Sequence, residues 1–329
     1  LLHTHFHHIN DYLFRFLVGY SECDLAETLG LGIEYMGKQN ADIVIGPPCP
    51  QGLACGLMMS HLSDIYQTAW MGWGYVTNPE FALADKYPFV TTLIAPSSTI
   101  GDCALEVIAE FKWDIISILY TSNEVRFCDD IVDSVMSSIG DSSASFVPTV
   151  AVKQMLDVNE LLSLVQRECS VSNGLTPIWE DGVNDNADGM DNVAKSAAKY
   201  MIVLDLNSSG VNQSYIAYFK SHVMSRVRED PLFCKTPECL SNSNQTAGIF
   251  ARHLHDTFYA YGLGLTREPT YYHDAANITL AINGNFTGLT GEVQMTANNT
   301  RVAEYMLYYL DSSFQQQIYM KMVNQNNYV

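Results

Sequence analysis

Residues 42–52 constrain the fold of this chain more than any other stretch. They begin with a short apolar, mostly β-branched run, which is the composition of a strand buried on both faces. Gly46 and two prolines end the run, because proline donates no backbone N–H and cannot extend a sheet. Apolar residues then recur at helical spacing, at Leu53, Leu57, Met58 and Leu62. A buried strand, a turn and an amphipathic helix make half of a βαβ unit, where ligands bind beyond the carboxyl ends of the strands.

Strand and helix patterns alternate along most of the remaining chain. Strands are predicted at residues 13–19, 68–73, 89–94, 115–120, 146–152 and 200–206. Amphipathic helices are predicted between them, and a polar loop is predicted at residues 170–192. From Glu292 onward the pattern becomes that of antiparallel strands. This order predicts an α/β fold with parallel sheets that helices cover on both faces.

Length and composition limit the possible classes of protein. A chain of 329 residues exceeds the usual single domain and favours two lobes. With 47% hydrophobic and 16% charged residues, it has enough apolar side chains for sizeable cores. The formal net charge of −19 argues against nucleic acid as a partner, because phosphate contacts need clustered Lys and Arg. No apolar run reaches the ~18 residues that span a membrane, so we expect membrane attachment only through a segment outside these residues.

Acceptor triplets for N-glycosylation indicate the compartment. Six Asn-x-Ser/Thr triplets follow Met201 and none precedes it, at Asn207, Asn212, Asn244, Asn277, Asn285 and Asn298. One triplet occurs easily by chance, but six in this part of the chain indicate a glycosylated, extracellular protein. Oxidising conditions permit disulfides among the eight cysteines. Cys234 and Cys239 lack two further ligands for a structural zinc, so a small disulfide loop is predicted.

The sequence contains no evident catalytic or metal-binding constellation. Residues 184–195 imitate the first half of a calcium loop, but Lys195 occupies the position that needs a bidentate Glu. The turn after Ile45 lacks the features of nucleotide-binding loops. His255 and Asp256 suggest a base and its orienting carboxylate, yet adjacent helix residues point about 100° apart, and no Gly-x-Ser-x-Gly turn accompanies them. We therefore predict that this chain is not an enzyme, and that His255 is a buried, hydrogen-bonding histidine.

Several motifs in a fixed order resemble one family. Residues 44–49 (Val-Ile-Gly-Pro-Pro-Cys), with Cys23 26 residues before Cys49, are similar to the ectodomain of natriuretic-peptide-type receptors. Residues 228–234 (Arg-Glu-Asp-Pro-Leu-Phe-Cys) and 255–259 (His-Asp-Thr-Phe-Tyr) resemble the nematode branch of receptor guanylate cyclases. Residues 286–291 (Phe-Thr-Gly-Leu-Thr-Gly) resemble a strand-entry motif of the whole superfamily. The resemblance extends over the chain from about Leu13.

The resemblance implies a type I periplasmic-binding fold of two Rossmann-like lobes with parallel sheets. We expect lobe one at residues 1–95 plus 206–287, and lobe two at residues 96–205 plus 288–329. Compared with the family, a strand and a helix before Leu13 are expected to be missing. A strand–helix–strand segment is also expected to be missing between Glu168 and Pro177, so that both lobes are truncated.

The resemblance also implies how the cysteines pair. A disulfide between Cys23 and Cys49 is expected, joining the start of one helix to the turn that begins the next. The family's second disulfide joins a cysteine like Cys128 to one on the missing strand, for which Cys169 is the nearest substitute. Two cysteines on predicted helices are expected as buried free thiols, namely Cys55 and Cys103.

A ligand, if there is one, is expected between the lobes, at the loops that follow the strands. These loops offer aromatic rings, hydroxyls and amides that suit a small polar molecule or a peptide side chain: Gln51, Trp73, Tyr75, Ser97, Thr99, Thr121, Ser122 and Asn123. The alternative for Trp73 is a core anchor under the next loop. Natriuretic-type receptors instead bind peptide between two ectodomains. The resemblance further implies a chloride ion at the turn from Gly46 to Cys49.

The function implied by the resemblance is extracellular ligand sensing for a receptor guanylate cyclase, whose cGMP-producing domain lies outside these residues. The alternatives are a secreted binding protein or decoy without an enzyme, and the ectodomain of a class C or glutamate-type receptor. Receptor cyclases of this type work as dimers. We expect a homodimer through lobe one, at residues 24–38 and 51–66. The face formed by residues 1 to about 170 lacks acceptor triplets, and these two segments have surplus apolar residues, among them Met58, Met59 and Tyr66. The alternative is that these residues only cover the sheet.

Overall fold

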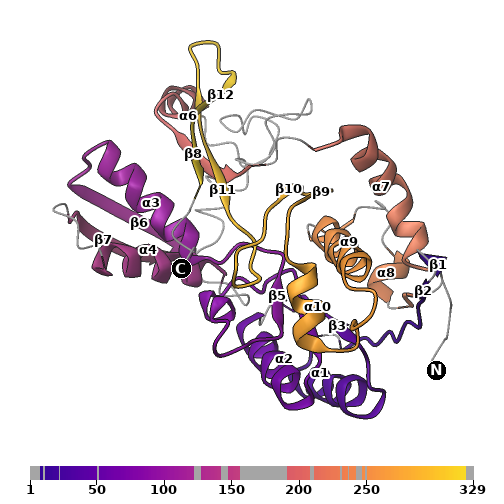
Figure 1. The fold of residues 1–329 in the computed structure, drawn as a ribbon. Coiled ribbons are helices and arrows are strands. Elements are labelled where there is room, and N and C mark those ends of the chain that lie inside the picture. Colours follow the sequence, from indigo (N-terminus) through magenta and orange to yellow (C-terminus); the bar gives the residue numbers. More distant parts are fainter. Residues whose placement is uncertain are drawn as a thin grey trace. The chain divides into compact units, whose positions relative to one another are not determined.

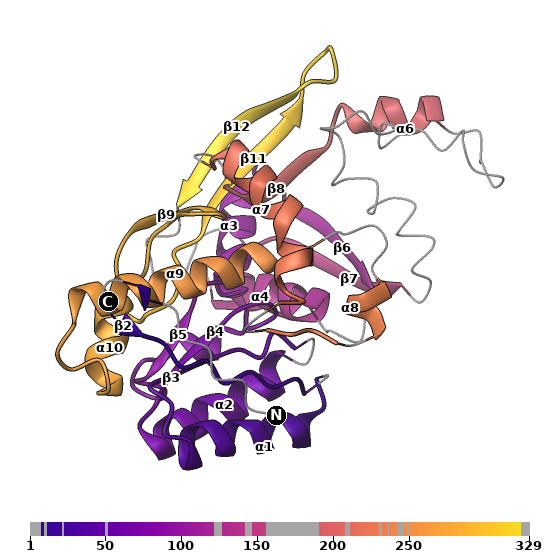
Figure 2. The same ribbon diagram turned by 90° about the vertical axis from the view of Figure 1, so that its right-hand side faces the viewer.

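The fold comes from a computed structural model (Figures 1 and 2). The structure describes residues 8–9, 12–21, 23–49, 52–121, 127–141, 147–155, 191–207, 211–229, 232–235, 237–241, 247–248 and 250–323. The chain forms two compact units. Unit 1 comprises residues 1–96, 208–302 and 325–329, and unit 2 comprises residues 97–207 and 303–324.

Two boundaries of the units lie within two residues of the expected lobe boundaries. The boundary after residue 302 lies elsewhere, and a fourth, after residue 324, was not expected. Unit 1 continues to residue 302, whereas lobe one was expected to end at residue 287. The reason is that residues after 287 pack in unit 1. Val293 and Met295 belong to the same buried cluster as Phe286, and the backbone N–H of Arg301 donates to the carbonyl of Thr92 over 3.0 Å.

Unit 1 is built on a three-stranded parallel sheet in the order β3–β4–β5, with bounds Ile43–Ile45, Ala69–Gly72 and Val90–Thr92. Helix α1 (Leu25–Gly32), its π-helical continuation η1 (Ile33–Lys38) and α2 (Gly52–Tyr66) contribute to the core on one face of the sheet. Helices α9 (Ala251–Arg267) and α10 (Ala275–Ile282) pack on the other face. The other described elements are β1 (His8–Ile9), β2 (Tyr12–Leu13), η2 (Pro79–Ala82), α7 (Gln213–Arg226), α8 (Pro237–Ser241), β9 (Phe286–Gly288) and β10 (Gly291–Val293).

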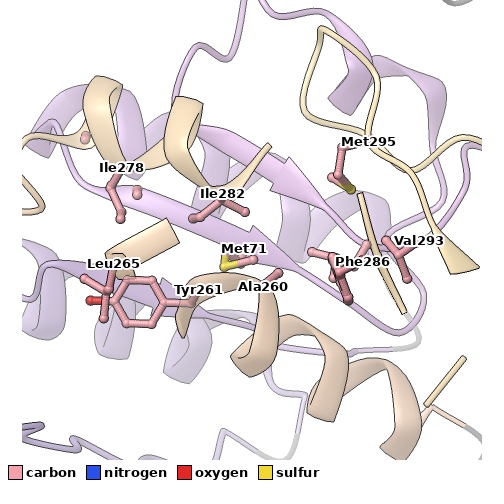
Figure 3. Close-up of a cluster of buried hydrophobic side chains, with 12 residues drawn as sticks. Met71, Ala260, Tyr261, Leu265, Ile278, Ile282, Phe286, Val293 and Met295 are labelled. Atoms are coloured by element: carbon pink, nitrogen blue, oxygen red, sulfur yellow. The ribbon is translucent and has the colours of Figure 1, made fainter. Parts of the chain in front are cut away.

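Strand β4 shows why this sheet is buried on both faces. Successive side chains of a strand point to opposite faces. Ala69 and Met71 accordingly pack with residues of α9 and α10 such as Ile278 (Figure 3). Trp70, between them, packs with Met59 of α2 in a second cluster. All of β4 is buried. The strand predicted at residues 68–73 is therefore a central strand, as its unbroken apolar run indicates.

Unit 2 contains parallel and antiparallel pairs of strands. Strands β6 (Ile115–Thr121) and β7 (Thr149–Met155) are parallel. Strands β8 (Ile202–Leu206), β11 (Glu304–Leu310) and β12 (Gln316–Val323) form an antiparallel sheet in the order β12–β11–β8. The helices described in this unit are α3 (Ser98–Glu110), α4 (Phe127–Asp141) and α6 (Asp191–Ala198). The antiparallel pattern predicted near the end of the chain is thus confirmed, and the predicted loop at residues 170–192 lies outside the described residues except for its last two.

Residues 14–20 are not the predicted strand, because their apolar side chains cover a helix instead of joining a sheet. The ring of Phe14 meets Tyr261 edge-on, and the ring of Phe16 meets Phe258, each with centroids 6.2 Å apart. Both partners lie on α9.

Met59 is a core residue rather than part of an exposed dimer face. Its side chain is 2% exposed. A Cβ atom added at Gly32 of α1 would lie 3.0 Å from the sulfur of Met59, so the two helices meet closely at this point. Met58 is half-buried, and Tyr66 is 38% exposed with its ring over Gly37. The apolar surplus of α2 therefore serves mainly the core. None of the helices in the described part of the chain is long and apolar enough to cross a bilayer.

Candidate functional site

The turn after β3 and the loop after β4 meet at the carboxyl end of the unit 1 sheet. Gly46 and Gly74 have φ angles of +94° and +80°, which other residues adopt only with strain. A Cβ atom at Gly74 would lie 2.6 Å from the side chain of Pro48. The indole N–H of Trp70 donates to the carbonyl of Gly46 over 2.7 Å. The glycines and prolines of this motif thus allow two loops to touch where a ligand of an α/β sheet usually binds.

Two aromatic residues of the loop after β4, Trp73 and Tyr75, are half-buried, the first next to this turn and the second in contact with the start of α9. Trp73 has a buried indole N–H with no hydrogen-bond partner. The same nitrogen would lie 3.1 Å from a Cβ atom at Gly46, so it is next to the turn. The ring of Tyr75 meets Phe250 edge-on, with centroids 4.8 Å apart. Since a buried N–H without an acceptor costs free energy, Trp73 is poised to donate to a bound group.

His253, in the first turn of α9, adds a second unpartnered group. Its Nδ1 atom is buried and has no hydrogen-bond partner. Burial, together with the positive charge of Arg301, lowers the pKa of His253 to about 4. The ring is therefore neutral at physiological pH, with one donor and one acceptor nitrogen. Phe250 lies between this histidine and Tyr75, its ring centroid 5.6 Å from that of His253.

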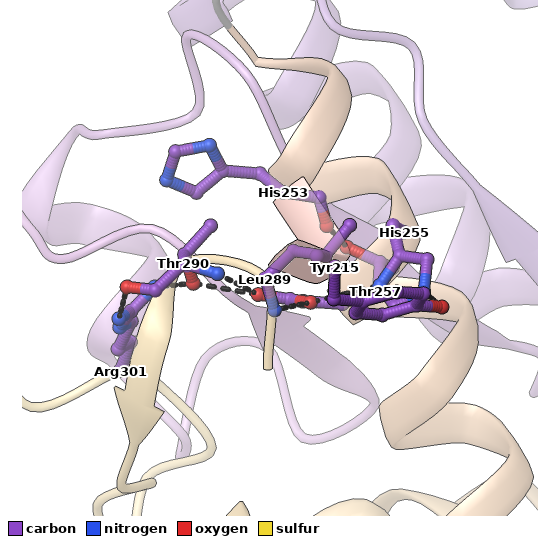
Figure 4. Close-up of polar contacts among 8 residues, drawn as sticks. Tyr215, His253, His255, Thr257, Leu289, Thr290 and Arg301 are labelled. Atoms are coloured by element: carbon purple, nitrogen blue, oxygen red, sulfur yellow. Dashed lines mark hydrogen bonds and ion pairs between the residues drawn. The ribbon is translucent and has the colours of Figure 1, made fainter. Parts of the chain in front are cut away.

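Asp256, one turn further along α9, fixes the connection between β9 and β10. Its carboxylate accepts the backbone N–H groups of Leu289 and Thr290, over 2.7 and 2.8 Å, and the hydroxyl of Thr290 over 2.6 Å (Figure 4). Burial favours the protonated acid, but hydrogen bonds from His255, Thr290 and Leu289 keep the pKa of Asp256 below its ordinary value. Gly288 is required here, because a Cβ atom would lie 2.5 Å from the carboxylate.

His255 and Asp256 are hydrogen-bonded to each other, although adjacent helix residues diverge. Nδ1 of His255 lies 3.0 Å from the carboxylate, and its Nε2 lies 3.1 Å from the hydroxyl of Tyr215. The histidine is half-buried rather than buried, with a 26% exposed side chain. Because the carboxylate also holds two backbone N–H groups, this arrangement orders unit 1 rather than activating a nucleophile.

The predicted ligand residues differ in burial, in hydrogen bonding and in whether the structure describes them. Ser97 and Thr99 are 2% and 1% exposed, and both hydroxyls are used inside unit 2. Ser97 accepts from Ser134 over 3.2 Å, and Thr99 lies 2.8 Å from the hydroxyl of Tyr305. These bonds argue against a ligand contact at either residue. Thr121 ends β6, but its side chain is outside the described part, as are Gln51, Ser122 and Asn123.

The sequence analysis did not indicate Phe250 or His253 as site residues, although the ring of Phe250 contacts both the predicted residue Tyr75 and His253. Phe250 appears in the sequence only as one apolar position of a helix, and His253 follows no motif. No pattern in the sequence indicates that the start of α9 approaches the loop after β4.

The structure does not form the expected bond between Cys23 and Cys49. Both are free thiols, as are Cys55 and Cys103. Burial raises the pKa of Cys49, and so do hydrogen bonding to Cys23 and the neighbouring Cys55. The expected pair is therefore in contact, with a third thiol beside it. Burial also raises the pKa of Cys103 to about 12.

The remaining four cysteines comprise a half-buried pair in unit 1 and two whose side chains lie outside the described part. Cys234 and Cys239 form a disulfide. The expected pairing of Cys128 with Cys169 lies outside the described residues, because the side chain of Cys128 and all of Cys169 are excluded.

The acceptor asparagines also differ in their surroundings. Three of them are exposed, namely Asn212, Asn277 and Asn285. Asn298 is half-buried, and Asn244 lies outside the described residues. The side-chain amide of Asn207 donates to Glu304 over 2.7 Å. Access to the amide nitrogen is therefore best at the three exposed positions.

The chloride that the resemblance implies would need N–H donors near the turn from Gly46 to Cys49. The unpartnered indole N–H of Trp73 lies beside Gly46 and is a donor of the required kind. The backbone N–H of Gly46 already donates to the carbonyl of Met71 over 2.9 Å, and Pro47 and Pro48 have no N–H, so few backbone donors remain at this turn and the chloride stays a prediction.

Comparisons with known proteins identify the family of this chain. The profile of the receptor family ligand binding region matches residues 5–313. The receptor-type guanylate cyclase gcy-4 of Caenorhabditis briggsae is 28% identical over 94% of this chain, and its Caenorhabditis elegans namesake is 30% identical over 92%. In both cases the match covers 32% of the relative, so this chain spans about a third of the length of these relatives.

Solved structures resemble the fold at low identity. The leucine binding protein LivK of Thermotoga maritima has a TM-score of 0.52 at 13% identity, with 93% of this chain and 87% of that chain covered. A solute binding protein of R. palustris in complex with benzoate has a TM-score of 0.54 at 13% identity, covering 92% and 83%. The fold is therefore the type I periplasmic-binding fold, and the chain belongs to the receptor family ligand binding region.

Proposed function

We propose that this chain is the extracellular ligand-sensing region of a receptor guanylate cyclase, coupled to cGMP production by a domain outside these residues. The observation that carries the proposal is the match of more than nine-tenths of the chain to receptor-type guanylate cyclases. The matched family is a ligand binding region, so the chemistry of cGMP synthesis belongs to another part of the receptor. The acceptor triplets support an extracellular location.

The full-length transcript tests this proposal against its rivals. We expect it to encode a transmembrane helix and a cyclase domain after residue 329, and we expect cells expressing it to produce cGMP. A stop codon soon after residue 329 would instead identify a secreted binding protein or decoy. A transmembrane region followed by no cyclase would favour a receptor of the class C or glutamate type.

A small polar molecule or a peptide side chain is the ligand that the unit 1 groups fit best. Trp73 offers a donor without an acceptor, and neutral His253 offers Nδ1 without a partner. The rings of Tyr75 and Phe250 are in edge-on contact and together supply aromatic surface. A site with aromatic walls and a few polar groups that converge is typical of small-molecule binding. The group that meets Trp73 has to be a hydrogen-bond acceptor, such as a carboxylate or a carbonyl.

Thermal unfolding of the purified chain with a panel of amino acids, small carboxylates and short peptides tests the ligand proposal. A ligand that binds only the folded state raises the midpoint of unfolding by mass action. We expect a hit to stabilise the wild type and to lose most of this effect in Trp73→Phe, which keeps a ring but lacks the N–H. Tyr271→Phe, at a tyrosine that is 63% exposed, is the control. Equal stabilisation of Trp73→Phe and wild type would place the ligand elsewhere.

A homodimer through the exposed side of α1 and α2 is the assembly we propose. Three apolar side chains of α2 remain 38% exposed or more, namely Leu53, Ile65 and Tyr66. His61→Asn creates an Asn-Leu-Ser triplet at an exposed position of this side, and a bulky glycan there has no room in an interface. We expect sedimentation to show a monomer for the glycosylated variant and a dimer for His61→Gln. A glycosylated His61→Asn dimer would exclude this face.

A further inference from the structure

Helix α7 presents a row of aromatic rings to solvent. Among its described residues only Ile216 is buried, whereas Tyr215 and Tyr218 are 45% and 57% exposed. The rings of these two tyrosines are nearly parallel, at an angle of 14° with centroids 6.4 Å apart. The ring of His222 stacks on Tyr218 at 4.2 Å. We call Tyr215, Tyr218 and His222 the α7 ladder.

The ladder is held in place by α9. The hydroxyl of Tyr215 lies 3.1 Å from Nε2 of His255, and the ring of Phe219 meets His255 edge-on. His255 is itself bonded to the buried carboxylate of Asp256. These contacts order the aromatic faces before anything covers them. Apolar surface exposed to water is unfavourable, so a cover that is already attached to the chain is favoured.

Asn212 lies at the start of the same helix and heads an Asn-Gln-Ser acceptor triplet. Its side-chain oxygen caps the helix by accepting the backbone N–H of Tyr215 over 3.0 Å. Capping uses Oδ1, whereas a glycan attaches to Nδ2, so both roles are compatible. Asn207 differs, because its Nδ2 donates to Glu304. Helical side chains tilt toward the N-terminus, so the ladder leans toward Asn212.

We propose that an N-linked glycan on Asn212 lies along the α7 ladder and covers it. The modification joins Nδ2 of Asn212 to the anomeric carbon of a lipid-linked oligosaccharide; one amide proton is lost and the lipid diphosphate leaves. Pyranose rings have apolar C–H faces and polar rims, which match aromatic faces with polar tips. Covalent attachment gives the sugar a high effective concentration at the ladder. The proposal rests on the extracellular placement proposed above.

The ladder extends from next to Asn212 along the axis of α7. Ten residues separate Asn212 from His222, which corresponds to a rise of about 15 Å along the helix. A protein partner is the competing occupant of this face, but a glycan beside Tyr215 would obstruct it. The experiment separates these occupants, because only the glycan protects the ladder in the purified chain.

Chemical labelling of the secreted chain tests the proposal. Ser214→Ala removes the acceptor triplet at an exposed residue and leaves the Asn212 cap in place. We expect nitration of Tyr218 by tetranitromethane, quantified by peptide mass spectrometry, to rise severalfold in Ser214→Ala and after enzymatic release of the glycan. Nitration of Tyr271 should not change. Asn277→Gln, which removes another exposed acceptor, should leave Tyr218 as protected as in wild type.

Removing one aromatic ring of the α7 ladder gives an independent measurement. In Tyr218→Ser the glycan loses its aromatic support, so an endoglycosidase should release it faster than from wild type, and Tyr271→Ser should have no such effect. An occupied Asn212 with equal Tyr218 nitration in wild type and Ser214→Ala overturns the proposal. So does an unoccupied Asn212 beside occupied Asn277 or Asn285, a result that leaves the extracellular placement intact. If no triplet is occupied, the extracellular placement fails as well.

Discussion

The parallel sheet of unit 1 and the strands of unit 2 use similar apolar residues but differ in how completely they are covered. Every residue of β4 and β5 is buried. In unit 2, Ile115 at the start of β6 is 74% exposed, and Ile318 of β12 is 58% exposed. In unit 1 the cover includes α9 and α10, which follow the sheet by more than a hundred residues in the chain. The comparison teaches that an apolar strand becomes a core strand only where distant helices supply its second face.

A matched pair of truncations tests this difference with the largest expected effect. Ile278 of α10 is 0% exposed and packs against the unit 1 sheet. Ile278→Ala should lower the free energy of unfolding by about 2–5 kcal/mol, because a buried cavity is left. Ile115→Ala removes the same atoms from an exposed site and should change it by less than about 0.5 kcal/mol. Urea unfolding measures both. Similar losses would show that β6 is covered as well as β4.

Acid should act on unit 1 through His253. Its folded-state pKa of about 4 lies below the unfolded value of 6.5, so the unfolded state binds the proton first. Stability should therefore fall as the pH drops from 6.5 to 4, by up to about 3 kcal/mol, and this contribution should be constant above and below that range. In His253→Gln, this fall in the free energy of unfolding between pH 6.5 and 4 should be smaller. Urea midpoints across this range provide the measurement, and an unchanged slope in the variant would contradict it.

Glycine substitutions should show the smallest effects and reveal where unit 2 is tightly packed. A Cβ atom at Gly101 of α3 would lie 2.5 Å from the carbonyl oxygen of Ser134 on α4. Gly101→Ala should lower the free energy of unfolding by about 1–3 kcal/mol, because the two helices have to separate. Nothing lies within 4 Å of a Cβ atom at Gly140, so Gly140→Ala should stabilise by at most about 1 kcal/mol. Equal thermal midpoints for the two variants would mean that α3 and α4 are loosely packed.

Local features of the fold could be predicted from the sequence, whereas contacts between distant segments could not. The turn at Gly46 and the strand through Trp70 depend on short stretches whose composition permits few conformations. Ser97 and Thr99 were placed correctly after a strand, but their partners, Ser134 and Tyr305, come from elements whose positions the sequence does not reveal. For the same reason, the contact of His253 with Phe250 beside Tyr75 could not be predicted from the sequence.

Helix faces were hard to assign for a related reason. Met59 and the exposed Ile65 both fit an apolar pattern on α2. Only the close approach of α1 at Gly32 decides that Met59 is buried. The alternation of strands and helices gave the fold class because it needs no knowledge of such approaches.

One turn of α9 carries both His253 and Asp256, which contact different parts of unit 1. His253 faces the aromatic groups beside Tyr75, and Asp256, three residues later, holds the connection that leads from β9 into β10. From β10 the chain continues to Val302, where unit 1 gives way to unit 2. The connection that Asp256 holds thus lies only twelve residues before this boundary along the chain. The carboxylate of Asp256 therefore anchors the last stretch of unit 1 that the chain passes through before it enters unit 2.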